Sequence, residues 1–295
     1  MLVTGNSGFL GAAVGRALLQ AGANVHGTGF RETPHACSTA HTMGLPDDVE
    51  PLLASVRPEV VFHLAAPVNP GRVPDEQAAR TAIVDGTQAV IAACGRMGAR
   101  LVHVGTCAEY GDVAVPYKES ESCCPLGAYG RMKHEASQSA VASSSLDWSV
   151  VRPFRAIGPG DTRSVVALAA RAAALGQPFE MTDGQQIREW NHVRSIAAGI
   201  VAAGAHPEAI HQIINVGGGP QRSVLSMVER VFALAGAEPS LVRAGARVRR
   251  PHEVDALFGD HSKAEGLWGR IQQPSLDHTL QLMVRENGGR AEVSA

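Results

Sequence analysis

The chain has 295 residues, 45% of them hydrophobic and 18% charged, which fits one large α/β unit or a larger domain with a smaller partner domain. The formal net charge of −2 argues against a nucleic-acid-binding protein, because such a protein needs a basic face. Arg171 and Arg194 interrupt the two most apolar stretches, and the amino terminus has no basic lead-in, so we expect neither a membrane span nor a signal peptide.

The first half of the chain alternates short apolar segments with longer helical patterns. Apolar and β-branched runs predict strands over residues 1–4, 24–28, 60–64, 101–104 and 148–151. Periodic apolar residues predict helices over residues 8–21, 49–56, 77–97 and 129–142. Strands that alternate with helices in this way are joined by crossovers, which indicates a parallel sheet covered on both faces. Beyond Gly158 the pattern changes to Ala-rich helices, Gly/Pro turns and an Arg-rich stretch, and residues 286–295 are polar enough to fray.

The cysteines and histidines indicate no disulfide framework and no metal site. The five cysteines are scattered and none lies in a C-x-x-C pair, and the twelve histidines lack metal-ligand spacing. We therefore expect a reducing, cytoplasmic location and a mechanism without a metal.

Residues 4–11 form a glycine-rich loop between the first strand and the first helix. The binding of a diphosphate requires close approach of the backbone and a helix amino terminus directed at the phosphates, and glycine permits both. Because the loop begins an alternating strand–helix series, we interpret it as a dinucleotide-binding loop and not as a structural turn. The cofactor contacts predicted here are Gly5, Ser7, Gly8, Phe9, Leu10 and Gly11.

The end of the second strand indicates which dinucleotide binds. An Asp or Glu there accepts hydrogen bonds from the adenosine ribose and repels a 2′-phosphate. This chain has Gly29 at about that place, and Arg31 follows within reach of a phosphate. We therefore predict NADP(H) in preference to NAD(H), with Arg31 as the phosphate contact. The alternative is that Arg31 lies on the surface, paired with Glu32.

Tyr129 and Lys133 are spaced i and i+4 on a predicted helix, which puts both on one face. A free tyrosine has a pKa of about 10, and a nearby ammonium group favours the phenolate and lowers that pKa. The pair is therefore interpreted as a general acid or base with its activating lysine; the alternative is an ordinary surface pair. Thr106 follows the strand over 101–104, at the edge where such sheets bind ligands, and its hydroxyl can bond a substrate carbonyl or only cap a turn.

These residues resemble the extended short-chain dehydrogenase family, whose members act mostly on nucleotide sugars. The resemblance also covers residues 61–66, 106–111, 152–154, 158–160, 188–190 and 215–219. It implies a Rossmann-type doubly wound parallel sheet in a cofactor domain over 1–155, with a strand that returns near 188–218. A smaller α/β substrate domain is expected over 156–295. It further implies that Leu64, Ala65 and Ala66 contact the cofactor, as do Tyr129 and Lys133, and that the helices over 77–97 and 129–142 form a homodimer.

The segment after Thr106 reduces the number of reactions that fit the sequence. Dehydratases of this family have an Asp-Glu pair directly after the catalytic Thr, whereas this chain has Cys107 and Ala108, with Glu109 one place further on. Residues 105–111 and 250–254 look more like those of GDP-4-keto-6-deoxymannose reductases. The resemblance therefore implies reduction of a 4-keto-6-deoxy sugar on a nucleotide, with Thr106, Tyr129 and Lys133 as the catalytic residues.

The expected substrate contacts are Cys107, Glu109, Arg155, Arg188 and Arg250. Arg188 and Arg250 offer paired donors to a diphosphate, although the cluster over 243–250 can equally be a solvated face. Arg155 stands where the family commonly has a substrate-contacting Asn, and Ile83 and Gly44 replace a helix Asn and an adenine-contacting Asp. Two other hypotheses stay open: an epimerase or atypical dehydratase that uses Cys107 or Glu109, and a catalytically silent NADP-binding sensor.

Overall fold

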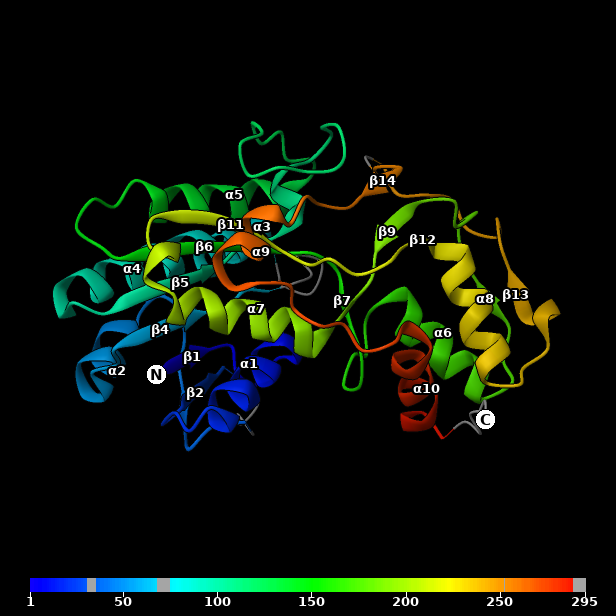
Figure 1. The fold of residues 1–295 in the computed structure, drawn as a ribbon, viewed down its shortest axis with the longest axis horizontal. Coiled ribbons are helices and arrows are strands. Elements are labelled where there is room, and N and C mark those ends of the chain that lie inside the picture. Colours follow the sequence, from blue (N-terminus) through cyan, green and yellow to red (C-terminus); the bar gives the residue numbers. More distant parts are fainter. Residues whose placement is uncertain (31–35, 68–74, 252, 289–295) are drawn as a thin grey trace.

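The structure is a computed structural model that describes residues 1–30, 36–67, 75–251 and 253–288. Its largest element is a parallel sheet of seven strands in the order β11-β6-β5-β4-β1-β2-β3 (Figure 1). In chain order the strands are β1 (Leu2–Thr4), β2 (His26–Gly29), β3 (Thr39–Thr42), β4 (Val60–His63), β5 (Arg100–Val104), β6 (Trp148–Pro153) and β11 (Gln212–Val216). The predicted Rossmann-type doubly wound parallel sheet is therefore confirmed.

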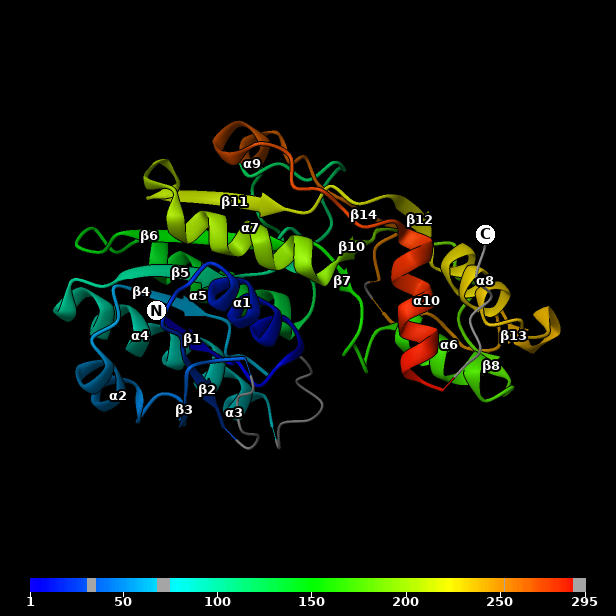
Figure 2. The ribbon, with the colours of Figure 1, turned by 60° about the horizontal axis from the view of Figure 1, so that its bottom comes forward.

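Two groups of helices cover the two faces of the sheet. α1 (Phe9–Gln20) and α7 (Val193–Ala205) pack together on one face, and α7 runs along the sheet beside α1 in Figure 2. α2 (Val49–Val56), α4 (Gly86–Met97) and α5 (Ala128–Val141) cover the other face. Neighbouring strand residues enter opposite clusters: Val3 and Phe62 face α1 and α7, whereas Leu2 and Val61 face the second group. A parallel sheet buried on both faces needs such continuous apolar strands.

The helix predicted over 77–97 consists of three consecutive segments. They are α3 (Glu76–Arg80), a π-helical turn (Thr81–Asp85) and α4. The Thr87 hydroxyl donates to the Ile83 carbonyl oxygen at 2.6 Å and lies 3.1 Å from the Nε2 atom of His63 in β4. This side-chain bond ties the π-helical turn to the sheet. The helix predicted over 77–97 is thus confirmed, and the π turn, which the sequence pattern does not indicate, places one extra residue in a helix that is otherwise continuous.

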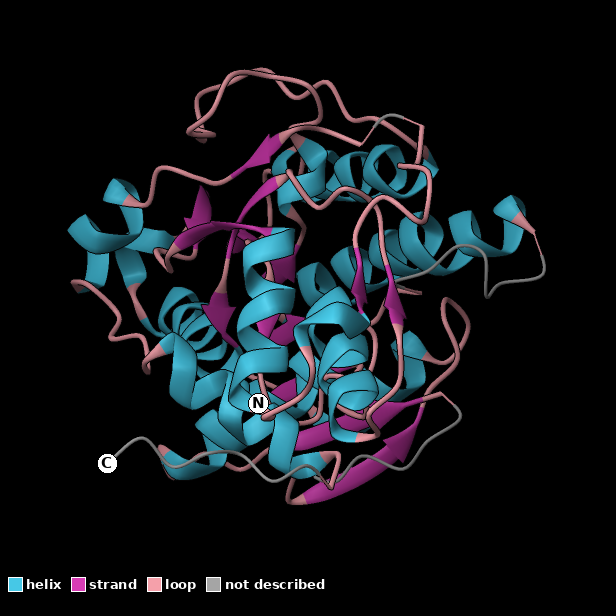
Figure 3. Ribbon diagram, turned by 90° about the vertical axis from the view of Figure 1, so that its right-hand side faces the viewer, coloured by secondary structure: helices cyan, strands magenta, loops and turns pink. Residues whose placement is uncertain are grey.

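The C-terminal part lies beyond the carboxyl ends of the strands, at the right of Figure 1. Its core is formed by α6 (Val165–Ala174), α8 (Val224–Leu234) and α10 (Leu276–Glu286), which pack on one another. Figure 3 views the molecule from this end, with its helices and short strands nearest the reader. Its short strands are β7 (Ala156–Ile157), β8 (Phe179–Glu180), β9 (Ile187–Glu189), β10 (Asn191–His192), β12 (Gln221–Ser223), β13 (Val242–Arg243) and β14 (Ala256–Leu257). α9 (Ser262–Trp268) instead lies beside β11 and packs into the apolar cluster of the large sheet (Figure 1).

The short strands form small mixed sheets, one of them in the order β12-β9-β14 with β12 antiparallel to β9. The expected smaller C-terminal α/β part is thus present. The chain also returns to the large sheet, because α7 and β11 belong to it although they follow β9 and β10 in sequence. Within the residues that the structure describes, no helix is both long and apolar enough to span a bilayer.

Candidate active site

The glycine loop is held in a conformation that only glycine accommodates. Gly5 has a φ of +71°, and its carbonyl oxygen accepts a hydrogen bond from the Gly8 amide at 3.0 Å. A Cβ on Gly11 would lie 2.1 Å from the Gly5 carbonyl oxygen, so the first turn of α1 and the loop touch through their backbones. Gly8 precedes α1 as its N-cap, and the first turn of that helix has no acidic residue. The loop and the helix amino terminus together can hold a diphosphate.

Asn6 stabilises this loop from behind. The side chain is fully buried, and its Nδ2 donates to the carbonyl oxygens of Gly11 at 3.2 Å and Ala36 at 3.1 Å. The predicted contacts Ser7, Phe9 and Leu10 lie between these fixed points and stay partly exposed. A rigid loop with partly exposed residues fits a dinucleotide phosphate, because the backbone donors are already in place when the ligand arrives.

The predicted cofactor segment after β4 lies against the same loop. The amides of Leu64 and Ala65 both donate to the Thr4 hydroxyl, at 3.1 and 3.2 Å. A Cβ on Gly5 would lie 2.9 Å from the Cα of Ala65, which shows how closely the two segments approach. Ala66 packs against the same apolar cluster as Tyr129. The structure therefore brings the loop, residues 64–66 and the catalytic tyrosine to one edge of the sheet.

The part of the cofactor site that distinguishes NADP(H) from NAD(H) is only partly described. β2 ends at Gly29, a buried residue without a carboxylate, and the ring of Phe30 is 66% exposed. Arg31, the predicted contact of the 2′-phosphate, lies outside the described residues.

The predicted catalytic residues meet at the carboxyl end of β5. Thr106 is the N-cap of a 3₁₀ turn (Cys107–Glu109), and its hydroxyl accepts a hydrogen bond from the Ala108 amide at 3.2 Å. Lys133 is buried, and its Nζ donates to the carbonyl oxygen of Val104 at 2.7 Å, which ties α5 to the last residue of β5. Tyr129 lies one turn before Lys133 on α5 and is partly exposed. Lys133 is thus fixed to the end of β5, one helical turn after Tyr129.

Burial is the main cause of the pKa shifts of both Tyr129 and Lys133. Burial lowers the pKa of Lys133 to about 8, although the carboxylate of Glu109 opposes this shift. Burial also raises the pKa of Tyr129, and Cys107 and Glu109 raise it further. Desolvation of the phenolate therefore dominates the pKa of Tyr129, and a lowering of that pKa by Lys133 stays a prediction. At neutral pH Tyr129 is a protonated phenol, which is the form that donates a proton.

The Cys107 thiol and the Glu109 carboxylate, the two candidate acids or bases after Thr106, are both buried in the protein. Cys107 is buried, and burial raises the pKa of its thiol to about 12. Glu109 is fully buried, and its carboxylate faces Thr106, Ser137 and Arg152 inside the protein. The Glu109 carboxylate is thus enclosed by protein groups, and its contact with a substrate stays a prediction.

The predicted substrate arginines lie close together but differ in their bonding. Arg188 in β9 is buried, and its guanidinium donates to the carbonyl oxygens of Ile187 and Val254, each at 2.8 Å, so it holds β14 beside β9. Arg250 is exposed. Arg155 lies over the ring of Trp190 at 5.4 Å, and its Nε is buried without a hydrogen-bond partner among the described residues.

Charge repulsion shows that the arginines share one site. Burial lowers the pKa of Arg155, and Arg250 contributes to that lowering. Burial likewise lowers the pKa of Arg188, with Arg155 adding to the effect. None of the ion pairs formed among the described residues includes Arg155. Asp161 and Glu253 lie near enough to Arg155 to raise its pKa in part, but neither forms a direct ion pair with it. A guanidinium partly removed from water without a direct ion pair is suited to bind an anionic group of a ligand.

A second buried network at this edge was not predicted as functional. The carboxylate of Glu189 lies 2.9 Å from the Nε2 of His261 and accepts hydrogen bonds from the amides of Gly218 at 2.7 Å and Gly259 at 3.1 Å. The hydrogen bond to Glu189 raises the pKa of His261 against the effect of burial. Glu189 lies within residues 188–190, one of the segments that resemble the family. Nothing in the sequence indicates that its partner is His261, which is 72 residues away.

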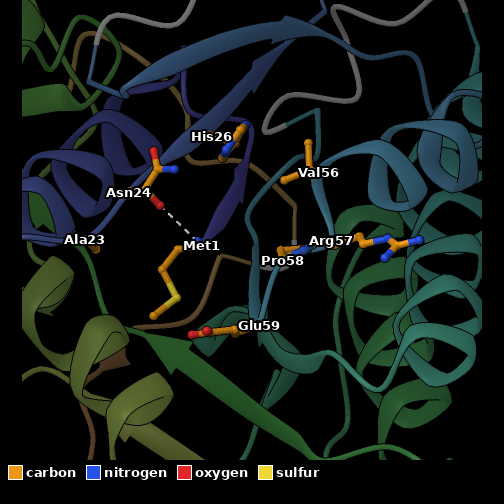
Figure 4. A pocket seen from close by; sticks show the side chains of 8 residues that line it. All are labelled: Met1, Ala23, Asn24, His26, Val56, Arg57, Pro58 and Glu59. Carbon is orange, nitrogen blue, oxygen red and sulfur yellow. Dashed lines mark hydrogen bonds between the residues drawn. The ribbon is translucent and has the colours of Figure 1, made fainter.

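A pocket elsewhere on the molecule lies far from this chemistry. Figure 4 shows its lining residues, which are Met1, Ala23, Asn24, His26, Val56, Arg57, Pro58 and Glu59. Met1 directly precedes β1, His26 begins β2 and Glu59 directly precedes β4. The pocket is therefore at the amino ends of the strands, whereas doubly wound sheets bind ligands at the carboxyl ends.

Comparison with known proteins identifies the family. Residues 1–217 match the sequence model of the NAD dependent epimerase/dehydratase family. The chain belongs to this family. The extended short-chain dehydrogenase resemblance is thereby confirmed at the level of the family, and the chain is a nucleotide-sugar-modifying, NAD(P)-dependent enzyme of this family.

Relatives within the family have different activities. The chain is 26% identical to the GDP-6-deoxy-D-mannose reductase of Pseudomonas aeruginosa, over 97% of this chain and 96% of that protein. It is 29% identical to the UDP-glucose 4-epimerase of Mycolicibacterium smegmatis, over 80% of this chain and 82% of the relative. The solved structure of MoeE5 in complex with UDP-glucuronic acid and NAD superposes with a TM-score of 0.86 at 26% identity, covering 97% and 98% of the two chains.

Proposed function

We propose that this family member reduces a keto group on a nucleotide-linked 4-keto-6-deoxy sugar with NADP(H). The observation that carries the proposal is the absence of an available acid or base beside Thr106 in the described structure. The Cys107 thiol has a pKa of about 12, Ala108 has no titratable group, and Glu109 is bonded inside the protein. Elimination of water needs a proton acceptor and a proton donor at that place, whereas reduction needs only one proton donor.

The residues at the carboxyl end of β5 can perform each step of a reduction. The nicotinamide, when bound at the glycine loop and residues 64–66, supplies a hydride. The Thr106 hydroxyl polarises the substrate carbonyl, and Tyr129 gives its phenolic proton to the developing alkoxide, so that C=O becomes CH–OH. Lys133, with a pKa of about 8, is largely protonated at neutral pH and stabilises the phenolate that remains. Solvent then restores the tyrosine proton.

The proposed substrate orientation follows from the arginines. Arg155 is close enough to both Arg188 and Arg250 for their charges to interact, and the three residues provide positive charge for the diphosphate of a nucleotide sugar. Of these, Arg155 is the one with a buried, unpartnered nitrogen. The preference for NADP(H) is supported by Gly29 at the end of β2 and by the sequence position of Arg31. The division at residue 155, the homodimer through residues 77–97 and 129–142, and a cytoplasmic location remain proposals.

The test is oxidation of the reduced cofactor with a panel of nucleotide sugars. We expect GDP-, dTDP- or UDP-linked 4-keto-6-deoxy sugars to oxidise NADPH faster than NADH, with one reduced sugar formed per cofactor. Tyr129→Phe is expected to abolish this turnover while the cofactor still binds. Isomerisation of a nucleotide sugar without net oxidation would instead identify a 4-epimerase, the activity of the M. smegmatis relative. A Tyr129→Phe protein that retained full biological activity would favour a non-catalytic NADP-binding sensor.

A further inference from the structure

The carboxylate of Glu109 joins three elements around the catalytic residues. Its Oε1 accepts hydrogen bonds from the Thr106 amide at 2.9 Å and from the Ser137 hydroxyl of α5 at 3.0 Å. Its Oε2 accepts from the Nε of Arg152 in β6 at 3.0 Å. With the bond from Ala108 to Thr106, the first of these contacts completes a capping box around the 3₁₀ turn (Cys107–Glu109). One side chain thus fixes the turn that presents Thr106 to the helix that presents Tyr129 and Lys133.

Gly105 leaves the space that the Glu109 carboxylate occupies. A Cβ on Gly105 would lie 2.2 Å from the Oε1 of Glu109 and 3.1 Å from the Oγ of Ser137. The φ of Gly105 is not in the positive range, so the backbone alone does not require glycine there. The absent side chain is explained by space, because the Glu109 carboxylate fills the position that any Cβ would need.

The interaction is charged and buried. Arg152 is 1% exposed and Glu109 is fully buried, so the carboxylate and the guanidinium stabilise each other where neither could remain charged alone. Although burial opposes it, the pKa of Arg152 is raised because Glu109 and Tyr110 lie beside it. Titratable groups face Glu109 from its own turn, from α5, from β6 and from the loop before α5: Cys107, Tyr129, Lys133, His134, Arg152 and Cys123.

We propose that Glu109 is a positioning residue, whose carboxylate locks the Thr106 turn onto α5 and supplies the negative charge under Tyr129 and Lys133. The proposal rests on the proposed function for its effect on turnover, but its effect on Lys133 is independent of any substrate. It replaces the earlier alternatives for Glu109, an acid/base or a substrate contact. The sign of its electrostatic effect is fixed, because a carboxylate raises the pKa of both the lysine and the tyrosine.

The variants must remove the charge without leaving a buried cation unpaired. Glu109→Gln alone leaves Arg152 without its partner, and breaking a buried ion pair can cost about 3–5 kcal/mol. The double variant Glu109→Gln with Arg152→Met removes both charges, keeps an oxygen that accepts from Thr106, and is expected to fold. Glu135→Gln is the matched control. Glu135 lies on α5, two residues after Lys133, and forms a half-exposed ion pair with Arg80.

The first measurement follows the lysine directly. The chain has only three lysines (Lys118, Lys133 and Lys263), so NMR of the full protein labelled at the lysine side-chain carbons resolves the titration of each. In the unaltered protein we expect Lys133 to titrate near pH 8. In the double variant its midpoint is expected to move to lower pH, and in Glu135→Gln it is expected to stay. An unmoved midpoint in a folded double variant would overturn the proposal, whatever the protein's reaction is.

The second measurement separates positioning from folding. For the double variant we expect kcat to fall about 10- to 100-fold, with the KM for NADPH unchanged and the alkaline limb of the kcat profile moved to lower pH. The Glu109→Asp variant, which retains the charge on a shorter side chain, is expected to recover the pH profile but not the full rate. If no reduction is observed with any variant or with the unaltered protein, the proposed function fails while the NMR result still decides the role of Glu109.

Discussion

The glycine loop gives a prediction whose size follows from the backbone geometry. Gly11→Ala places a methyl group 2.1 Å from the Gly5 carbonyl oxygen, 2.7 Å from the Gly5 carbonyl carbon and 2.9 Å from the Cα of Asn6. All three neighbours are backbone atoms, so no side chain can rotate away and the loop itself must shift. Overpacking of this kind costs about 1–3 kcal/mol. We expect the free energy of unfolding, measured with urea and no added cofactor, to fall by about that amount.

Gly8→Ala is the contrasting variant in the same loop. Its methyl group would meet only the Gly5 carbonyl oxygen, at 3.2 Å, and Gly8 has φ and ψ of −81° and 164°, which alanine adopts easily. The unfolding free energy should therefore change by less than about 1 kcal/mol, the usual range for an N-cap substitution. Gly266→Ala in α9 meets nothing within 4 Å, and should stabilise the protein by about 0.5–1 kcal/mol.

The cofactor affinities complete this test. If the shift of the loop in Gly11→Ala weakens cofactor binding by the same free energy, the dissociation constant for NADPH should rise about 5- to 150-fold, which corresponds to about 1–3 kcal/mol. Gly8→Ala should also weaken binding, because its methyl group adds bulk where the diphosphate approaches, but without the loss of stability. A Gly11→Ala protein as stable as the unaltered one, or less affected than Gly8→Ala, would refute the reasoning from backbone contact.

Three further predictions concern the residues around Thr106. Lys133 has a pKa lowered to about 8 in the folded protein, so the unfolded chain binds more protons between about pH 8 and 10.5, and the stability contributed at this site rises with pH over that window. Lys133→Met should abolish turnover, but its free energy of unfolding at pH 7 should be at least as high as that of the unaltered protein. If urea unfolding of the variant and of the unaltered protein had the same pH dependence, the lowered pKa of Lys133 would be contradicted. Arg155→Ala should raise the KM for the nucleotide sugar about tenfold or more while leaving the KM for NADPH unchanged; an unchanged sugar KM in steady-state kinetics would remove Arg155 from the substrate site. Cys107→Ala should retain the pH profile of kcat, because a thiol with a pKa of about 12 takes no part in proton transfer near neutrality, whereas a lost limb of the profile would revive the dehydratase hypothesis.

Most of the large sheet could be predicted because its strands are apolar on both faces. β1, β2, β4, β5 and β6 begin and end within two residues of the predicted segments. β3 (Thr39–Thr42) was missed, since an exposed edge strand needs no apolar side chains and its sequence is Thr-Ala-His-Thr. The short strands of the C-terminal part contain two or three residues each, too few for a period of two to be visible.

The positions of the proposed catalytic residues could be predicted because they depend on local spacing. Thr106 follows a buried strand, and Lys133 lies four positions after Tyr129 on one helix. The burial of Glu109 could not be predicted, since it depends on Arg152, which is 43 residues away and reaches it only in the folded sheet. The raised pKa of Tyr129 could not be predicted for a related reason: charge partners can be inferred from a sequence, but the extent of desolvation cannot.

The path of the chain through α7 and β11 has a consequence for truncation and unfolding of the protein. Residues 193–216 complete the large sheet and cover one of its faces, although they follow elements of the C-terminal part. A fragment that stops at residue 155 would leave β6 as an open edge and expose the apolar surface under α7, so it should associate with other copies and not fold independently. The two parts therefore cannot be exchanged between relatives by a single splice, and we expect them to unfold as one cooperative unit.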